Sequence, residues 1–193
     1  MSFGVVFPGQ GSQRVGMLEE AAGAFSVVSD TFYEASEALG YDLWHLVSQG
    51  PAEKLALTEY TQPAILTASV ALFRAFTEAN TFTPGAGAGH SLGEYSALVS
   101  AGTLSLADGV RLVRQRGAAM QDAVPVGVGA MAVVMGLDDD VVTDTCNSVS
   151  TAGSFVGGVN FNAPGQVVIA GHSVAVDAAV AALKDAGARR AMP

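Results

Sequence analysis

The sequence predicts an α/β protein with two parts. Half of its 193 residues are apolar and 14% are charged, which suits a buried parallel sheet covered by helices. Strand and helix patterns alternate in the first part, and this is the order from which parallel sheets are built. After Gly129 the order changes to strand, helix, two strands and helix. We therefore expect one domain over residues 1–125 and a smaller one over residues 126–193.

The first domain is expected to begin with a buried strand, Phe3 to Phe7, which a loop starting at Pro8 ends. Small residues at 86–89 are consistent with a strand that leads into a turn and a helix. The helical spacing of apolar residues predicts helices around 26–39, 61–79 and 105–123. Residues 42–50 and 51–57 are expected to form short helices and connections.

The second domain is expected to be a small split βαβ unit of the ferredoxin-like kind. Its predicted elements are a strand at 130–135, a helix at 138–149, strands at 155–161 and 166–170, and a helix at 174–186. Asn162-Ala163-Pro164-Gly165 supplies turn residues between the two paired strands. With one more strand from Ala188 to Pro193, the order becomes βαββαβ.

Composition and charge argue against several classes of protein. The net charge of −9 disfavours binding to nucleic acid, which needs concentrated Lys and Arg. The single Cys146 cannot form an internal disulfide, in agreement with a reducing compartment. The N-terminus lacks the pattern of a signal peptide, and no stretch approaches a membrane span. We expect a cytoplasmic protein with no membrane partner, no metal site and no phosphate-binding loop.

Gly89-His90-Ser91-Leu92-Gly93 fits the G-x-S-x-G turn that presents a nucleophilic serine between a strand and a helix. The serine of such a turn is held in a strained backbone conformation, and the flanking glycines let the main chain pack closely. Its Oγ projects from the fold, and the amide of the next residue, Leu92, faces the same space. The pattern predicts Ser91 as a nucleophile, with an ordinary glycine turn as the alternative.

Two further segments carry candidate site residues. Gln10 lies in a loop between two glycines, where main-chain amides can approach a ligand, and a plain glycine-rich turn is the alternative. On the helix at 105–123, Arg116 lies about 70° from the centre of the apolar stripe, whereas Arg111 points away from it. A half-buried arginine needs an anionic partner, which is either a ligand or a structural ion pair.

None of the three histidines is a strong candidate for the base that would activate Ser91. His90 adjoins Ser91, but adjacent side chains on a sharp turn diverge. His45 lies in an amphipathic stretch and is expected to be structural. His172 lies between a strand and a helix, where a cap or a surface role is expected.

Five segments, in the same order, resemble the malonyl-CoA:acyl carrier protein transacylases of bacterial fatty-acid synthesis. The resemblance runs from Phe3 to Pro193 and covers nearly the whole chain. The segments are Phe7-Pro8-Gly9-Gln10-Gly11-Ser12-Gln13, Thr61-Gln62-Pro63-Ala64, Gly89-His90-Ser91-Leu92-Gly93-Glu94-Tyr95-Ser96-Ala97, Gln115-Arg116-Gly117 and Asn160-Phe161-Asn162-Ala163-Pro164-Gly165-Gln166.

The resemblance implies a ping-pong acyl transfer through a malonyl-serine intermediate. Ser91 would attack the thioester of malonyl-CoA, and the phosphopantetheine thiol of acyl carrier protein would then take the malonyl group. In the family, the amides of the residues that match Gln10 and Leu92 form the oxyanion hole. The arginine that matches Arg116 holds the malonyl carboxylate. No bound cofactor is implied, because malonyl-CoA is the substrate.

The resemblance also places other residues at the substrate site and points beyond this sequence. The residues that match Gln62, Asn160 and His90 line the site. In the family the chain continues through a Pro-Ser-His segment, which supplies the histidine base, and through further strands and helices of a hydrolase-like parallel-sheet core. These 193 residues contain neither. The resemblance therefore implies an incomplete core, truncated before the catalytic histidine, with exposed apolar sheet surface and with little activity or stability of its own.

Other functions stay open at this point. The alternatives are the acyltransferase domain of a polyketide synthase, a serine hydrolase that uses Ser91 with His172, and a non-catalytic binding protein. Arg116 argues against a hydrolase of neutral esters, which has no use for a buried cation. Acyl carrier proteins are acidic, so docking would need a local basic patch, for which Lys184, Arg189 and Arg190 are the candidates.

Overall fold

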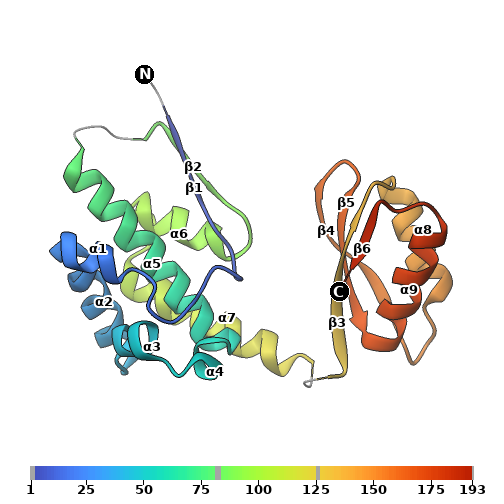
Figure 1. The fold of residues 1–193 in the computed structure, drawn as a ribbon, viewed down its shortest axis with the longest axis horizontal. Coiled ribbons are helices and arrows are strands. Elements are labelled where there is room, and N and C mark those ends of the chain that lie inside the picture. Colours follow the sequence, from blue (N-terminus) through green and yellow to red (C-terminus); the bar gives the residue numbers. More distant parts are fainter. Residues whose placement is uncertain (1–2, 81–83, 125–126, 193) are drawn as a thin grey trace. The chain divides into compact units, whose positions relative to one another are not determined.

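The computed structural model describes residues 3–80, 84–124 and 127–192, and the chain divides into two compact units, Met1–Asp122 and Ala123–Pro193. In the first unit the elements are β1 (Gly4–Phe7), α1 (Glu19–Ala24), α2 (Ser26–Leu39), α3 (Leu43–Gln49), α4 (Ala52–Leu55), α5 (Thr58–Ala79), β2 (Ala86–Gly89), α6 (Leu92–Ser100) and α7 (Leu106–Asp122) (Figure 1). In the second they are β3 (Gly129–Met135), α8 (Asp139–Val149), β4 (Val156–Ala163), β5 (Gln166–His172), α9 (Ser173–Asp185) and β6 (Arg190–Met192).

The first unit is built around one buried helix, α5. Every residue from 61 to 71 on this helix is buried, because α2, α6 and α7 pack around it (Figure 1). The helix begins at Thr58, earlier than the predicted start at 61, and it continues through Pro63. Proline removes one backbone hydrogen bond, and the close packing of the surrounding helices holds the chain in place. This buried helix is the support for the site described below.

The parallel sheet of the first unit has two strands, β1 and β2. One face of β1 packs on α5, because the ring of Phe3 meets that of Phe76 and the ring of Phe7 meets that of Phe73. On the other face Val6 is 84% exposed. The prediction of a buried strand over residues 3–7 is therefore wrong for one of the two faces. Within the described part of this unit, no layer of helices covers that face.

The remaining helices of the first unit largely confirm the sequence analysis. Helices α2 and α7 match the predicted ranges within one residue at each end, and the two predicted short segments contain α3 and α4. Helix α1 was not predicted, because none of its six residues is buried and so no apolar stripe marks it. None of the helices in the described ranges is long and apolar enough to cross a membrane.

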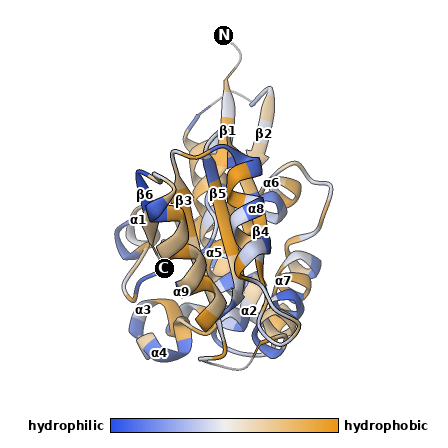
Figure 2. Cartoon of the chain, turned by 90° about the vertical axis from the view of Figure 1, so that its right-hand side faces the viewer, coloured by the Kyte–Doolittle hydropathy of each residue, from blue (hydrophilic) through white to orange (hydrophobic). Residues whose placement is uncertain are grey.

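The second unit has the predicted βαββαβ order, with its strands in the antiparallel sheet β4-β5-β3-β6. Helices α8 and α9 pack on one face of this sheet, where Val134, Ile169 and Val176 are buried. Much of β3 and β5 is hydrophobic (Figure 2). The turn between β4 and β5 consists of Pro164 and Gly165, and Gly165 has a φ of 72°, which favours glycine.

Candidate active site

Ser91 lies on a sharp turn between the end of β2 and the start of α6. Its backbone has φ 56° and ψ −114°, and within the described ranges only Leu18 and Ser91 combine a side chain with a positive φ. Such a conformation costs on the order of 1–3 kcal/mol and persists only where the surroundings enforce it. The side chain makes no cap hydrogen bond to α6 and is exposed. The strained backbone expected for a nucleophile elbow is therefore present.

Two glycines enforce this turn. A Cβ on Gly89 would overlap the carbonyl group of Gly93, and a Cβ on Gly93 would overlap the carbonyl oxygen of Phe7. The start of α6 is thus pressed against the end of β1, which leaves no room for a side chain at either position. This close approach explains why the motif needs glycine on both sides of Ser91.

Two backbone amides at the elbow and the neighbouring loop are candidates for an oxyanion hole. The loop after β1 lies against the elbow, since a Cβ on Gly9 would be 3.5 Å from the carbonyl oxygen of His90. Among the described residues, neither the amide of Gln10 nor that of Leu92 donates a hydrogen bond to a protein acceptor. The amide of Leu92 also begins α6, where the helix dipole favours negative charge. Both groups suit the stabilisation of an oxyanion.

Arg116 reaches Ser91 from α7. Its Nη2 donates to Ser91 Oγ at 2.9 Å, its Nη1 donates to Gln62 Oε1 at 2.9 Å, and the guanidinium carbon lies 5.8 Å from the ring centre of Tyr95. The side chain is half-buried. The salt bridges found among the described residues involve Arg74 and Arg111 and not Arg116. A cation with neutral partners thus stands directly beside Ser91.

The approach of α7 to α5 places Arg116. A Cβ on Gly117, the next residue, would lie 2.5 Å from the carbonyl oxygen of Thr58 and 2.8 Å from the Cα of Glu59. Glycine therefore lets α7 touch the first turn of α5. Arg111, on the opposite side of α7, is 55% exposed and meets Asp108 at 3.6 Å, as expected of a surface charge.

Gln62 lies on α5 beneath the site and is fully buried. Its Oε1 accepts from Arg116, and its Nε2 donates to Gln10 Oε1 at 3.2 Å and to Met120 Sδ at 3.3 Å. The structure thus brings Gln10, Gln62, Ser91, Leu92 and Arg116 together in the first unit. Asn160 lies on β4 of the second unit, opposite Val168 and next to an irregularity of the strand, and its expected role stays a prediction.

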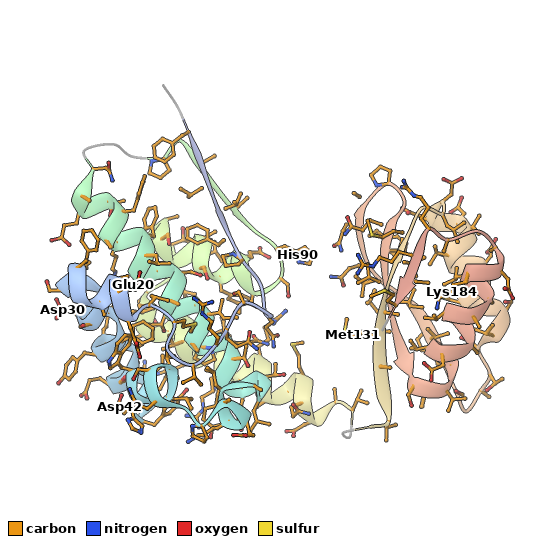
Figure 3. All side chains as sticks on the ribbon, viewed as in Figure 1. Glu20, Asp30, Asp42, His90, Met131 and Lys184 are labelled. Atoms are coloured by element: carbon orange, nitrogen blue, oxygen red, sulfur yellow. The ribbon has the colours of Figure 1, made fainter. Side chains whose placement is uncertain are left out.

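The histidines occupy three different settings. His90 is exposed on the elbow and projects outward (Figure 3). His45 is exposed on α3, where its backbone amide is capped by Asp42 at 2.8 Å. His172 belongs to the second unit, and its Nδ1 accepts from the Phe155 amide at 3.0 Å, a surface role as expected. Among the described residues, no group of three or more His, Cys, Asp or Glu side chains is arranged to hold a metal ion.

Sequence reasoning missed Tyr95 and Met120 as neighbours of the site. Tyr95 packs under Arg116, and Met120 contacts Gln62 although it is 49% exposed. Helical spacing carries the signal that would have found them. Met120 follows Arg116 by four positions on α7, so the two share one helix face. Tyr95 lies in the first turn of α6, four positions after Ser91, which precedes the helix.

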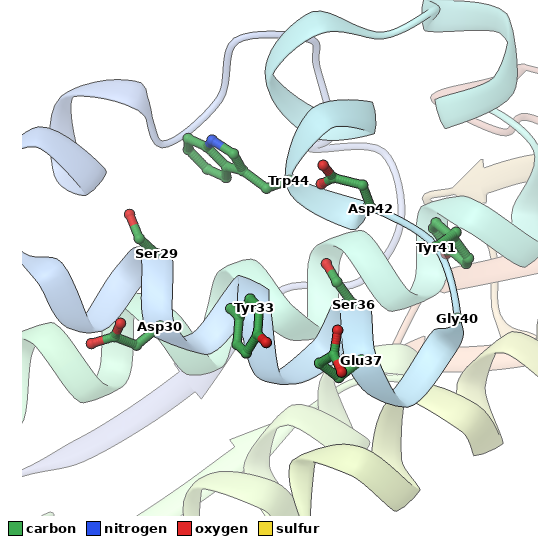
Figure 4. Close-up of a pocket in the computed structure, with 9 residues that line it drawn as sticks. All are labelled: Ser29, Asp30, Tyr33, Ser36, Glu37, Gly40, Tyr41, Asp42 and Trp44. Carbon is green, nitrogen blue, oxygen red and sulfur yellow. The ribbon is translucent and has the colours of Figure 1, made fainter.

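A pocket of about 800 Å³ lies between α2 and α3, away from the elbow in sequence (Figure 4). Its walls are acidic and aromatic, and they include Asp30, Tyr33, Glu37 and Trp44. None of the predicted site residues lines it. The chemistry expected at Ser91 therefore does not depend on this pocket.

Comparison with known proteins identifies a family match over most of the chain. The family model of the acyl transferase domain matches residues 5–192. The malonyl CoA-acyl carrier protein transacylase of Escherichia coli K12 is 59% identical over 191 residues, which are 99% of this chain and 62% of that protein. The chain thus spans about three fifths of the length of the curated relatives that it matches.

Solved structures agree over the whole chain. The malonyl CoA-acyl carrier protein transacylase of Coxiella burnetii superposes with a TM-score of 0.93 at 49% identity, covering 100% of this chain and 60% of that one. A malonyl-transacylase solved in complex with a type II PKS acyl-carrier protein has a TM-score of 0.92 at 55% identity, covering 100% of this chain and 62% of that one.

Proposed function

Since the chain belongs to the acyl transferase domain family, we propose that Ser91 accepts a malonyl group from malonyl-CoA and passes it to the phosphopantetheine thiol of an acyl carrier protein. The relative from Escherichia coli and that from Coxiella burnetii carry the name of this activity. The observation that carries the proposal is the contact between Arg116 and Ser91, at 2.9 Å. It sets a cation where the free carboxylate of a malonyl group would lie when its other carbonyl reaches Ser91.

In the first step, Ser91 Oγ attacks the thioester carbonyl of malonyl-CoA. The bond from Oγ to the carbonyl carbon forms, the serine proton passes to a base, and the negative charge on the carbonyl oxygen is met by the amides of Gln10 and Leu92. The carbon–sulfur bond then breaks, and coenzyme A leaves as the thiol after taking up a proton. In the second step, the carrier thiol repeats this sequence on the malonyl ester of Ser91.

Arg116 selects the acyl group in this scheme. Its planar guanidinium can bind a carboxylate through two parallel hydrogen bonds. The bond to the exposed Ser91 is the one that exchanges, because the other partner, Gln62, is buried and cannot move aside. A malonyl group thus binds the arginine and frees Ser91 Oγ for attack, whereas an acetyl group leaves Arg116 on Ser91.

The base is expected from the Pro-Ser-His segment of the family, and no histidine of this sequence is assigned that role. We propose that β1, β2 and α6 belong to a hydrolase-like core and that the second unit is the ferredoxin-like subdomain of the family. Asn160 and His90 are proposed to contact the substrate. The acyl carrier protein is the proposed partner, and malonyl-CoA is a substrate and not a bound cofactor.

The test uses the extended chain, defined as these 193 residues joined to the part of the Escherichia coli relative that lies outside the matched 62%. Incubation with malonyl-CoA should add one malonyl group, detected by mass spectrometry of the intact protein. Ser91→Ala should abolish the adduct, whereas Ser29→Ala, at an exposed serine of α2, should keep it. An adduct that survives Ser91→Ala would refute the assignment.

A polyketide pathway is the second candidate, because one similar structure is a malonyl-transacylase bound to a type II PKS acyl-carrier protein. The two candidates share the chemistry at Ser91 and differ in the carrier. Transfer rates from the malonyl-Ser91 adduct to a fatty-acid carrier and to a polyketide carrier, measured side by side, distinguish them.

A further inference from the structure

Gln62 is a fully buried polar side chain, and both the oxygen and the nitrogen of its amide make hydrogen bonds. Arginine carries only donors, so the atom of Gln62 that faces Arg116 must be the oxygen Oε1. The nitrogen Nε2 is then directed at Gln10 Oε1 and Met120 Sδ. A buried amide that lost these partners would pay for its desolvation, and this fixes the orientation of the side chain.

The two hydrogen-bond acceptors of Arg116 differ in their exposure. Gln62 is 0% exposed, whereas Ser91 is open to solvent on the elbow. Both acceptors are neutral, so neither cancels the charge of the guanidinium. Arg74 shows the other arrangement on this chain, since its guanidinium meets the carboxylate of Glu34 at 2.7 Å. In Arg116, Nη1 is held by the buried Gln62, whereas Nη2 can exchange Ser91 for a ligand. The guanidinium keeps its full positive charge because both partners are neutral.

We propose that Gln62 is a positioning residue that makes the site selective for acyl groups with a free carboxylate. It anchors Nη1 of Arg116 through a neutral oxygen, so that Nη2 and the full charge stay available to the incoming group. Its Nε2 also holds the side chain of Gln10, whose backbone amide is one of the two proposed oxyanion donors. Gln62 thus links carboxylate recognition to the oxyanion loop. The inference rests on the function proposed above.

The variant Gln62→Glu distinguishes the positioning of Arg116 from a packing role of Gln62. Gln62→Glu keeps the shape of the side chain and an acceptor for Arg116, but it adds a carboxylate that competes with the substrate and loses the donor to Gln10. Gln62→Asn keeps a neutral amide and withdraws it by one methylene. Gln115→Glu is the matched control, because it makes the same charge change at an exposed position of α7 beside Arg116.

The variants are compared in the extended chain with malonyl-CoA and acetyl-CoA as donors. For Gln62→Glu, kcat/KM for malonyl transfer should fall roughly 10- to 100-fold, mainly through KM, because a charged hydrogen bond to the substrate is lost. Acetyl transfer should fall less than malonyl transfer, because it loses the bond between Gln62 and Gln10 but does not use the charge of Arg116. For Gln62→Asn, kcat/KM for malonyl transfer should lie between those of the wild type and Gln62→Glu. For Gln115→Glu it should equal that of the wild type.

A second measurement needs no turnover and uses the 193-residue chain. Monomethyl malonate carries the carboxylate and the ester of the acyl group, and methyl acetate carries the ester alone. The first compound should raise the unfolding midpoint of the first unit, followed through Trp44, and the second should not. Gln62→Glu should remove the effect of monomethyl malonate and Gln115→Glu should retain it. This measurement decides the question if Gln62→Glu lowers the yield of active protein.

The outcomes distinguish a failure of the proposed function from a failure of the role of Gln62. Failure of the wild-type extended chain to form a malonyl adduct counts against the proposed function. A normal adduct with an unchanged ratio of malonyl to acetyl transfer in Gln62→Glu and Gln62→Asn overturns the role of Gln62. Equal losses for both donors, together with a lowered unfolding midpoint, would likewise assign Gln62 to packing alone.

Discussion

Gly117 offers a sharp test of how the fold places Arg116. In Gly117→Ala the new Cβ would lie 2.5 Å from the carbonyl oxygen of Thr58 and 2.8 Å from the Cα of Glu59, where ordinary contact begins at 3.4 Å. Helix α7 must therefore move away from α5 by about 0.9 Å, the difference between 3.4 Å and 2.5 Å. The obstacle is backbone of the central helix, which cannot rotate aside as a side chain would.

Two opposing terms set the size of the effect. Alanine stabilises a helix interior by about 1 kcal/mol relative to glycine. Overpacking costs about 1–3 kcal/mol, and contact with rigid backbone places Gly117→Ala at the upper end. We expect a net loss of about 1–2 kcal/mol in the free energy of unfolding of the first unit. The same shift lengthens the bond from Arg116 to Ser91, so the preference for malonyl over acetyl transfer should also fall.

Gly23→Ala is the matched control, because Gly23 lies on α1 and a Cβ there would meet nothing within 4 Å. It should gain about 0.5–1 kcal/mol from helix propensity alone. Urea unfolding of the 193-residue chain measures both variants through Trp44, the only tryptophan, whose ring packs 5.0 Å from that of Phe32 in the first unit. A Gly117→Ala chain as stable as Gly23→Ala would refute the reasoning about the contact between α5 and α7.

Arg116→Ala should raise the activation free energy of malonyl transfer by about 2–4 kcal/mol more than that of acetyl transfer, since only the malonyl carboxylate needs the cation. Competition between the two thioesters measures this difference, and equal losses would exclude the role. Exchanging Arg189 and Arg190 for Glu should slow transfer to acyl carrier protein at low salt, and an unchanged rate would place the docking patch elsewhere. Burial raises the pKa of Tyr41 well above its usual range, so its phenol stays protonated in the folded state after the unfolded chain has ionised. Its contribution to stability should be intact below about pH 10 and be lost as the pH rises further, and Tyr41→Phe should unfold with less dependence on pH in that window. Burial also raises the pKa of the Cys146 thiol, so a thiol reagent should modify the folded chain slowly and react quickly once the second unit unfolds; rapid modification under native conditions would contradict this.

The strained turn at Ser91 and most of the helices followed from sequence because they depend on neighbours in the chain. Five consecutive residues make the turn at Ser91, and their glycines allow the close approach that the structure shows. The apolar stripe of α7 repeats within one helix and predicted both its limits and the half-buried position of Arg116. Helix α1 lacks such a stripe, so local pattern could not find it.

Burial could not be derived in the same way. The apolar run from Phe3 to Phe7 looks the same whether one face or two are covered, and only the packed unit shows that Val6 is 84% exposed while Phe7 lies against α5. Strand pattern reports that a residue is apolar. Whether another layer lies over it depends on segments far away in the chain.

The network at the site was decided by tertiary structure. The bond from Gln62 to Gln10 joins residues 52 positions apart, and that from Arg116 to Gln62 joins residues 54 positions apart. Sequence alone supplied the residue types: a glutamine that can both donate and accept, an arginine that can only donate, and a serine on a strained turn. Two close contacts bring these side chains within hydrogen-bond distance of one another. Gly117 lets α7 pack against α5, and Gly93 lets the start of α6 pack against the end of β1. Hydrogen bonds between residues so far apart in sequence form only where packing brings their helices and loops together. The sequence therefore determined which functional groups are present, and the packing of α5 and α7 determined how they are arranged.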